Sequence, residues 1–189
     1  FEKKKEAIKL LKKAGVKVVR SGTIALEKNI ESFQTLRSLV KELRLDAWEW
    51  YRPVSKEPLV STEKLKELID ILYEYKKKGE FYPIANAIPF CFYDTEKVNE
   101  VSLGARFDDG HTRIVLSPKG YFKPSYFLDI NLGEELEKAW KNRPEYDLFP
   151  ECNDCIHRRV CKGGSRLFEK DPLMKSFSQT TTQFKEIFD

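Results

Sequence analysis

Three of the four cysteines lie close together near the end of this chain, and their spacing constrains the fold more than any other feature. Cys152, Cys155 and Cys161 form a C-x2-C-x5-C pattern. Two intervening residues suit a tight turn that points two sulfurs the same way, and the longer gap lets the third approach from another side. Gly163 and Gly164 then allow the backbone to pass close to whatever the thiolates bind, with N–H groups directed at sulfur. The pattern predicts a ligand loop, and residue chemistry alone fits zinc and an iron–sulfur cluster equally.

Length and composition bound the class of protein. A chain of 189 residues can bury a substantial core, as one large domain or two small ones. Its apolar runs are too short to cross a bilayer and no signal peptide opens it, so we expect no membrane association and a cytoplasmic location. The 34 basic and 30 acidic residues are interleaved, which argues against nucleic-acid binding, and a charged fraction of 34% is typical of thermophilic proteins. Crowded cysteines in such a chain favour metal over disulfides.

The first half of the chain predicts helices and strands in alternation. Apolar residues recur at helical spacing in three segments, and a β-branched or aromatic run follows each one. The predicted helices cover 6–14, 30–43 and 65–73, and the predicted strands cover 16–24, 46–53 and 81–91. Gly15 and Gly79 suit helix ends, and Asn29 suits the N-cap of the second helix. This order predicts parallel strands joined by right-handed crossovers, in a barrel segment or an open sheet.

A different pattern follows Cys91. Ser117-Pro-Lys-Gly120 carries the proline and glycine of a hairpin turn between two strand candidates. A helix before the cysteine loop directs Leu136, Ala139 and Trp140 inward. The predicted elements are strands at 112–116 and 121–127 and helices at 132–141 and near 184–188.

Several of these segments occur in the same order in one enzyme family. They are the helix-to-strand passage around Gly15, the helix-start Asn29, the strand Trp50-Tyr-Arg-Pro53, the hairpin Ser117-Pro-Lys-Gly120-Tyr-Phe-Lys-Pro124, and the cysteine pattern followed by Lys-Gly-Gly-Ser-Arg166. The chain thereby resembles the C-terminal portion of a radical S-adenosylmethionine (SAM) enzyme with a SPASM- or Twitch-type domain, in the group of peptide-modifying and pyrroloquinoline-quinone-synthesis-like proteins. The resemblance implies an α/β fold: a partial parallel (β/α) barrel over 1–90, then a small SPASM/Twitch-like iron–sulfur domain with a hairpin and a cysteine loop over 91–189.

The resemblance also implies one auxiliary [4Fe–4S] cluster, held by Cys152, Cys155 and Cys161. The family carries further cysteines where this chain has Ser125 and Ser165. Because those thiolates would build a first auxiliary cluster, we expect one cluster rather than two.

Cys91 is the remaining thiol and the candidate fourth ligand, because a [4Fe–4S] cube prefers four thiolates. The alternative for Cys91 is a buried free thiol beside proline and phenylalanine. We expect His157 to be an exposed loop residue rather than a ligand. The loop also carries basic residues that either offset the charge of a cluster or simply face solvent. They are Arg158, Arg159, Lys162 and Arg166.

Arg20 and Arg52 are candidate contacts for a carboxylate of SAM or substrate. We expect both near the carboxyl ends of strands, where α/β folds bind their ligands. The resemblance places what remains of the cofactor pocket at 20–23, 50–52 and 85–86. Trp48 and Trp50 share one strand face, which predicts packing in the core or in a pocket wall.

These observations favour the second half of a radical SAM enzyme that modifies a peptide or a small molecule, with SAM as cofactor of the parent enzyme. The auxiliary cluster would transfer electrons or help position substrate. The chain starts at Phe1 inside a predicted helix and lacks the radical-generating C-x3-C-x2-C loop, so we expect a fragment that is inactive alone. The alternative function is a non-catalytic protein with structural zinc in its cysteine loop.

Overall fold

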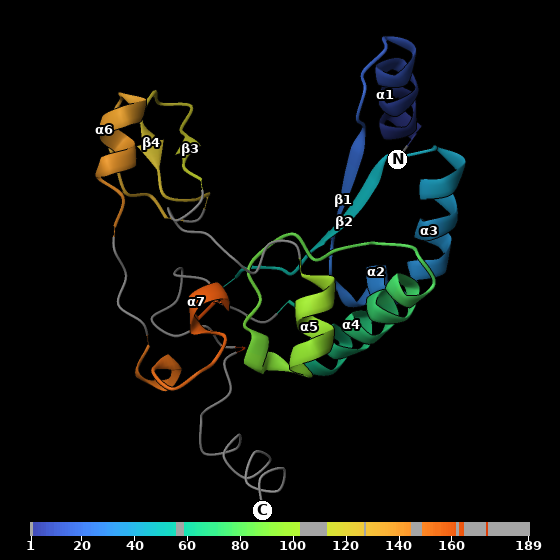
Figure 1. The fold of residues 1–189 in the computed structure, drawn as a ribbon. Coiled ribbons are helices and arrows are strands. Elements are labelled where there is room, and N and C mark those ends of the chain that lie inside the picture. The colour runs from blue at the N-terminus through green and yellow to red at the C-terminus, as the bar shows by residue number, and fades with distance from the viewer. Residues whose placement is uncertain are drawn as a thin grey trace, which may run out of the picture. The chain divides into compact units, whose positions relative to one another are not determined.

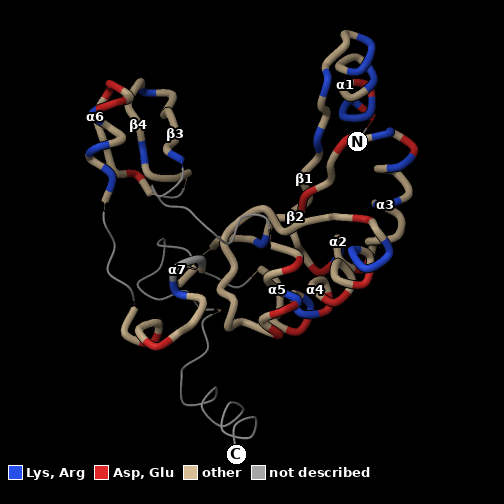
Figure 2. Tube along the Cα trace, viewed as in Figure 1, with Lys and Arg blue, Asp and Glu red and all other residues tan. Residues whose placement is uncertain are grey.

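The computed structural model describes residues 2–55, 59–102, 113–126, 128–144, 149–161, 163–164 and 173. The chain divides into two compact units, Phe1–Ala85 (unit 1) and Asn86–Asp189 (unit 2). The predicted boundary lies five residues later, between 90 and 91, and the family assignment of the two domains stays a prediction. Figure 1 shows the elements of both units, and Figure 2 shows basic and acidic residues interspersed along the chain. No described helix has the length and apolar character needed to span a bilayer.

Unit 1 alternates helices with parallel strands, as predicted. Its elements are α1 (Glu2–Lys13), β1 (Arg20–Ile24), α2 (Glu27–Glu31), α3 (Phe33–Glu42), β2 (Ala47–Tyr51) and α4 (Thr62–Lys77). β1 and β2 run parallel, with Gly22 opposite Glu49 (Figure 1). The fold is therefore mixed α/β, and the described residues contain no barrel.

The predicted strand at 81–91 is reduced to a single parallel bridge between Trp50 and Ile84. The Trp50 N–H donates to the Pro83 carbonyl and the Ala85 N–H donates to the Trp50 carbonyl, each at 2.7 Å. Pro83 has no N–H of its own, so it cannot extend the ladder. Further along, Phe90–Phe92 forms a short 3-10 helix, η1, instead of strand.

An aromatic cluster forms the core of unit 1. The Phe33 ring lies 5.2 Å from the Trp48 ring, 5.8 Å from the Trp50 ring and 5.2 Å from the Tyr75 ring, measured between centroids. Tyr82 packs edge-on against Trp48 at 5.1 Å. The prediction that Trp48 and Trp50 pack in the core is confirmed, because both are fully buried. α4 buries four further aliphatic side chains, Leu65, Leu68, Ile69 and Leu72.

Helix ends in unit 1 follow local chemistry, with one exception. Gly15 and Gly79 adopt positive φ after α1 and α4, as predicted. Ser61 caps α4 by accepting the Lys64 N–H at 3.3 Å. The prediction that Asn29 is an N-cap is wrong, because α2 begins earlier, with Leu26 as its N-cap. Asn29 instead donates its side-chain amide to the Ile24 carbonyl at 2.8 Å.

A partly buried ion pair joins α3 to the segment after α4. The Arg37 guanidinium donates to both carboxylate oxygens of Glu80, through Nε at 2.9 Å and through Nη2. Lys41 Nζ adds a contact at 3.1 Å, and the Tyr82 hydroxyl donates to the same carboxylate. These donors, Arg37 first, lower the pKa of Glu80 to about 2, while burial raises the pKa of Tyr82 to about 12.

Unit 2 consists of short elements. They are η1, α5 (Thr95–Val101), β3 (Val115–Leu116), β4 (Phe122–Lys123), α6 (Leu136–Lys141), η2 (Pro150–Cys152) and α7 (Arg158–Cys161). The predicted hairpin is confirmed: β3 and β4 pair antiparallel, and Gly120 closes the turn with φ 89° and an N–H bond to the Ser117 carbonyl. In α6 only Ala139 is buried, so the prediction that Leu136 and Trp140 face inward is wrong. The predicted helix near 184–188 lies outside the described residues.

Candidate metal centre

The cysteine loop folds as two short helical turns separated by a tight turn. Pro150 begins η2, where its missing N–H costs nothing, and the Cys152 N–H donates to the Phe149 carbonyl at 2.7 Å. The Cys155 N–H then donates to the Cys152 carbonyl at 3.2 Å, which closes the C-x2-C turn. The predicted tight turn is confirmed. α7 ends at Cys161, whose N–H donates to the His157 carbonyl at 2.9 Å.

The two glycines after the loop have the conformation that the sequence predicts. Gly163 and Gly164 have φ values of 83° and 86°, a region that other residues rarely adopt. A Cβ at position 163 would lie 2.6 Å from the Phe149 ring and 3.6 Å from Cys152 Sγ. The Gly163 backbone also forms a hydrogen bond to the Cys161 sulfur. A larger residue would therefore occupy the space beside the thiols.

The segment that carries Cys91 lies against this loop. The Phe90 N–H, one residue before Cys91, donates to Cys161 Sγ at 3.4 Å in a buried position. The Phe90 ring also packs on the His157 ring, with centroids 5.5 Å apart and planes at 58°. His157 is thus half-buried against Phe90, and the expectation of an exposed loop histidine is wrong. The fold brings the segment of the fourth cysteine to the loop of the other three across about seventy residues of sequence.

Burial and mutual repulsion make these thiols hard to ionise. All four are free cysteines; Cys152 and Cys161 are 8% and 7% exposed, whereas Cys91 and Cys155 are half-buried. Burial raises the pKa of Cys152 to about 11, and the charges of Cys161, Cys155 and Cys91 add to this rise. Burial also raises the pKa of Cys161, opposed by the N–H groups of Phe90 and Gly163. A cation that binds thiolates reverses this preference and releases protons on binding.

The donor set suits a thiophilic metal. Four thiols without a disulfide, backbone N–H groups directed at one sulfur, and a glycine that leaves space beside another are the features of a thiolate metal site. Among the described residues, however, no three such side chains stand close enough to form a preassembled metal-holding group. The residues fit a metal or cluster, and binding would draw the sulfurs together.

The basic residues of the loop give a partial answer. Arg158 is exposed and donates through Nη1 to the Asn153 carbonyl, so its guanidinium is fixed to the loop backbone. Lys162, Arg166 and the side chain of Arg159 lie outside the described part of the structure. The prediction that this charge offsets a cluster stays a prediction.

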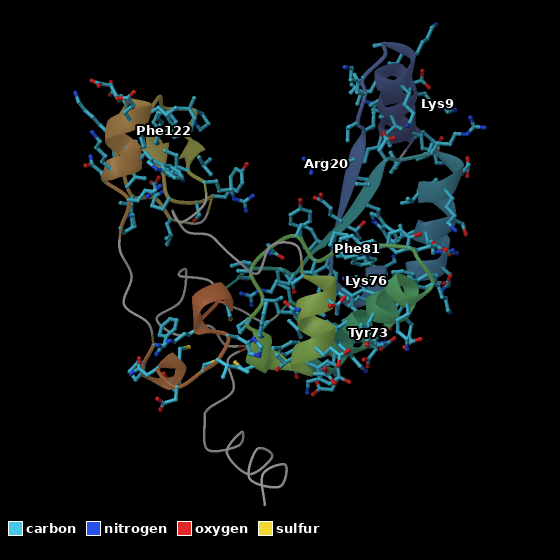
Figure 3. All side chains as sticks on the ribbon, in the orientation of Figure 1. Lys9, Arg20, Tyr73, Lys76, Phe81 and Phe122 are labelled. Atoms are coloured by element: carbon cyan, nitrogen blue, oxygen red, sulfur yellow. The ribbon has the colours of Figure 1, made fainter. Side chains whose placement is uncertain are left out.

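The two arginines of unit 1 occupy different positions. Arg20 is the first residue of β1, so the expectation that it lies near a carboxyl strand end is wrong (Figure 3). Its Nη1 instead donates to Glu49 Oε1 at 3.0 Å. Arg52 directly follows β2 and is 4% exposed, as expected for the carboxyl end of that strand. Its contact with a ligand carboxylate stays a prediction.

Sequence reasoning did not identify Glu49 as a buried charge. Arg20, Gly22, Glu49 and Tyr51 share the sheet face opposite Trp48 and Trp50, since side chains alternate along a strand. The Tyr51 hydroxyl donates to Glu49 Oε2 at 2.7 Å, and the Tyr51 ring lies where a Cβ on Gly22 would sit, 2.7 Å from Cε2. The alternation of Trp48, Glu49, Trp50 and Tyr51 was the available signal.

Phe90 and Phe149 were also missed as neighbours of the thiols. Phe90 precedes a cysteine and Phe149 precedes the loop, but an aromatic residue beside cysteine does not by itself indicate a thiol contact. Their positions follow from tertiary packing, which periodicity does not report.

Comparisons with known proteins give one structural likeness. No protein family model matches the chain, and no curated protein matches its sequence. The fold is similar to that of a solved radical SAM enzyme structure, a polyhistidine-tagged protein described as "anSMEcpe with bound AdoMet", with a TM-score of 0.56 and 17% sequence identity. The likeness covers 96% of this chain and 55% of that chain, so this chain spans about half of its length. At this identity the likeness concerns the fold alone.

Proposed function

We propose that this chain is the C-terminal part of a radical SAM enzyme and that its second unit binds one auxiliary [4Fe–4S] cluster. Cys91, Cys152, Cys155 and Cys161 would be the ligands. The cluster would supply electron transfer or help position the substrate, a peptide or small molecule, in a cytoplasmic enzyme. SAM would bind elsewhere in the parent enzyme, and residues 1–90 would form part of its barrel.

One contact carries this proposal: the Phe90 N–H donates to Cys161 Sγ. It joins the Cys91 segment to the cysteine loop, so that four thiols belong to one region of unit 2. The sequence motif alone offers three ligands, whereas a [4Fe–4S] cube prefers four thiolates. The fold likeness to a radical SAM enzyme supports the cluster over zinc.

Metal analysis of anaerobically purified protein tests the proposal. We expect a brown protein with about four iron and four sulfide per chain. Stoichiometric zinc without visible absorbance would instead support the non-catalytic alternative, since zinc accepts the same thiolates. Protein that folds equally well without any metal would contradict both functions.

Ligand variants sharpen the assignment. Cys155→Ser is expected to abolish the cluster, whereas Cys91→Ser should weaken it, giving lower iron content or faster loss in air. Ile156→Ala is a matched control, because Ile156 lies in the same loop and is 80% exposed. A full-strength cluster in Cys91→Ser would remove Cys91 from the ligand set.

A further inference from the structure

Two backbone N–H groups converge on a single thiol. Cys161 Sγ accepts the Phe90 N–H at 3.4 Å and also the Gly163 N–H. Phe90 is 3% exposed, so its N–H has no competing water and cannot leave the sulfur cheaply. Cys161 is therefore distinguished by its backbone environment as well as by its burial.

His157 contacts both partners of this hydrogen bond. Its carbonyl accepts the Cys161 N–H at 2.9 Å, which fixes the end of α7. Its ring packs on the Phe90 ring at 5.5 Å. A single residue thus connects the backbone of the sulfur acceptor to the side chain of the residue that donates to it.

We propose that the Phe90 amide sets the reduction potential of the cluster through Cys161, and that His157 is the positioning residue that holds this amide in place. This inference rests on the proposed function. An N–H dipole directed at a thiolate ligand stabilises the additional negative charge of the reduced cluster more than the charge of the oxidised one. The hydrogen bond therefore raises the potential, and its loss makes the potential more negative.

A pair of substitutions at position 90 separates the amide from the ring. Phe90→Ala and Phe90→Pro both remove the ring, but only Phe90→Pro removes the N–H. Proline is compatible with the first position of η1, because Pro89 has the extended ψ of 135° that a residue before proline requires. We expect Phe90→Pro to have a more negative midpoint potential than Phe90→Ala at equal iron content. Equal potentials in the two variants would overturn the role of the amide.

Substitutions at His157 test the positioning role. His157→Ala removes the ring contact and is expected to shift the potential in the negative direction. His157→Phe keeps a ring against Phe90 without an ionisable group, and we expect it to restore the wild-type value. An unchanged potential in His157→Ala, or equal shifts in both variants, would show that ring packing does not position the amide.

Iron content distinguishes failure of this inference from failure of the proposed function. Wild-type protein without iron and sulfide would refute the proposed function and, with it, the cluster on which the inference rests. If the variants at position 90 lose the cluster, hyperfine spectroscopy of the reduced wild-type protein in H₂O and D₂O provides the second measurement. We expect a slowly exchanging proton coupled to the cluster, since the Phe90 amide is buried; its absence would overturn the inference.

Discussion

The two units of this chain reach stability by different routes. In unit 1, a 16-residue α4 and a parallel strand pair bury large apolar side chains against an aromatic cluster. In unit 2, the described helices have three to seven residues and the strands have two. Elements this short bury little surface individually, and small domains of this kind are usually cross-linked by disulfides or metals. We infer that unit 1 depends on its core and unit 2 on its thiols.

Metal removal gives the largest expected effect and the clearest separation of the units. Bound structural metal can supply about 10 kcal/mol of folding free energy. After removal of the metal, we expect amide hydrogen exchange to accelerate by about 100-fold or more across 149–161, while α4 stays protected. Equal acceleration in α4 would show that the units do not differ in the way described.

Truncation of the aromatic core should act on unit 1 alone. Trp50→Ala is expected to lower the free energy of unfolding of unit 1 by about 3–5 kcal/mol, because it leaves a large cavity among packed rings. Trp140→Ala is the matched control: Trp140 is partly exposed on α6, and its loss should cost less than about 1 kcal/mol. Urea titrations measure both, and similar losses would contradict the contrast.

The Glu80 ion pair is expected to contribute less than the core. Glu80→Gln should lower the free energy of unfolding by about 2 kcal/mol at pH 7, after allowance for partial exposure. The folded-state pKa of about 2 lies below the usual 4.5, so this contribution is present above pH 4.5 and is lost as the pH falls toward 2. Glu74→Gln, at an exposed pair with Lys77, is the control. A difference that grows on acidification would refute this assignment.

Helix capping provides the smallest effect. Ser61→Ala removes the side-chain acceptor of the Lys64 N–H and is expected to cost about 1 kcal/mol in thermal or urea unfolding. Ser32 is the N-cap of α3 without a side-chain cap bond, so Ser32→Ala should cost only about a few tenths of a kcal/mol. If the two variants lose the same stability, the cap geometry does not explain it.

The sequence was most informative where local chemistry decides the structure. Periodicity located the helices of unit 1, and Gly15, Gly79 and Gly120 marked turns whose φ values are positive. It failed where neighbours decide: Asn29 finds the Ile24 carbonyl rather than its own helix start, and Leu136 stays 60% exposed on α6. A residue's helical spacing does not state whether anything covers that face.

The candidate site shows the same division. The C-x2-C turn and the glycine passage follow from spacing and conformational freedom, both local properties. The approach of Phe90 to Cys161 joins residues 71 positions apart, and the pairing of Arg20 with Glu49 depends on strand register. Such contacts are products of tertiary folding and have no signature in a single sequence.

Gly22 has a consequence for how variants of this protein should be interpreted. It is exposed on β1, and a solvent-facing position is ordinarily tolerant of exchange. Yet any side chain there would displace the Tyr51 ring, and Glu49 would then keep a buried carboxylate with one donor fewer. Mutational intolerance at position 22 would thus report a carboxylate on the neighbouring strand, with no change in anything that Gly22 itself binds.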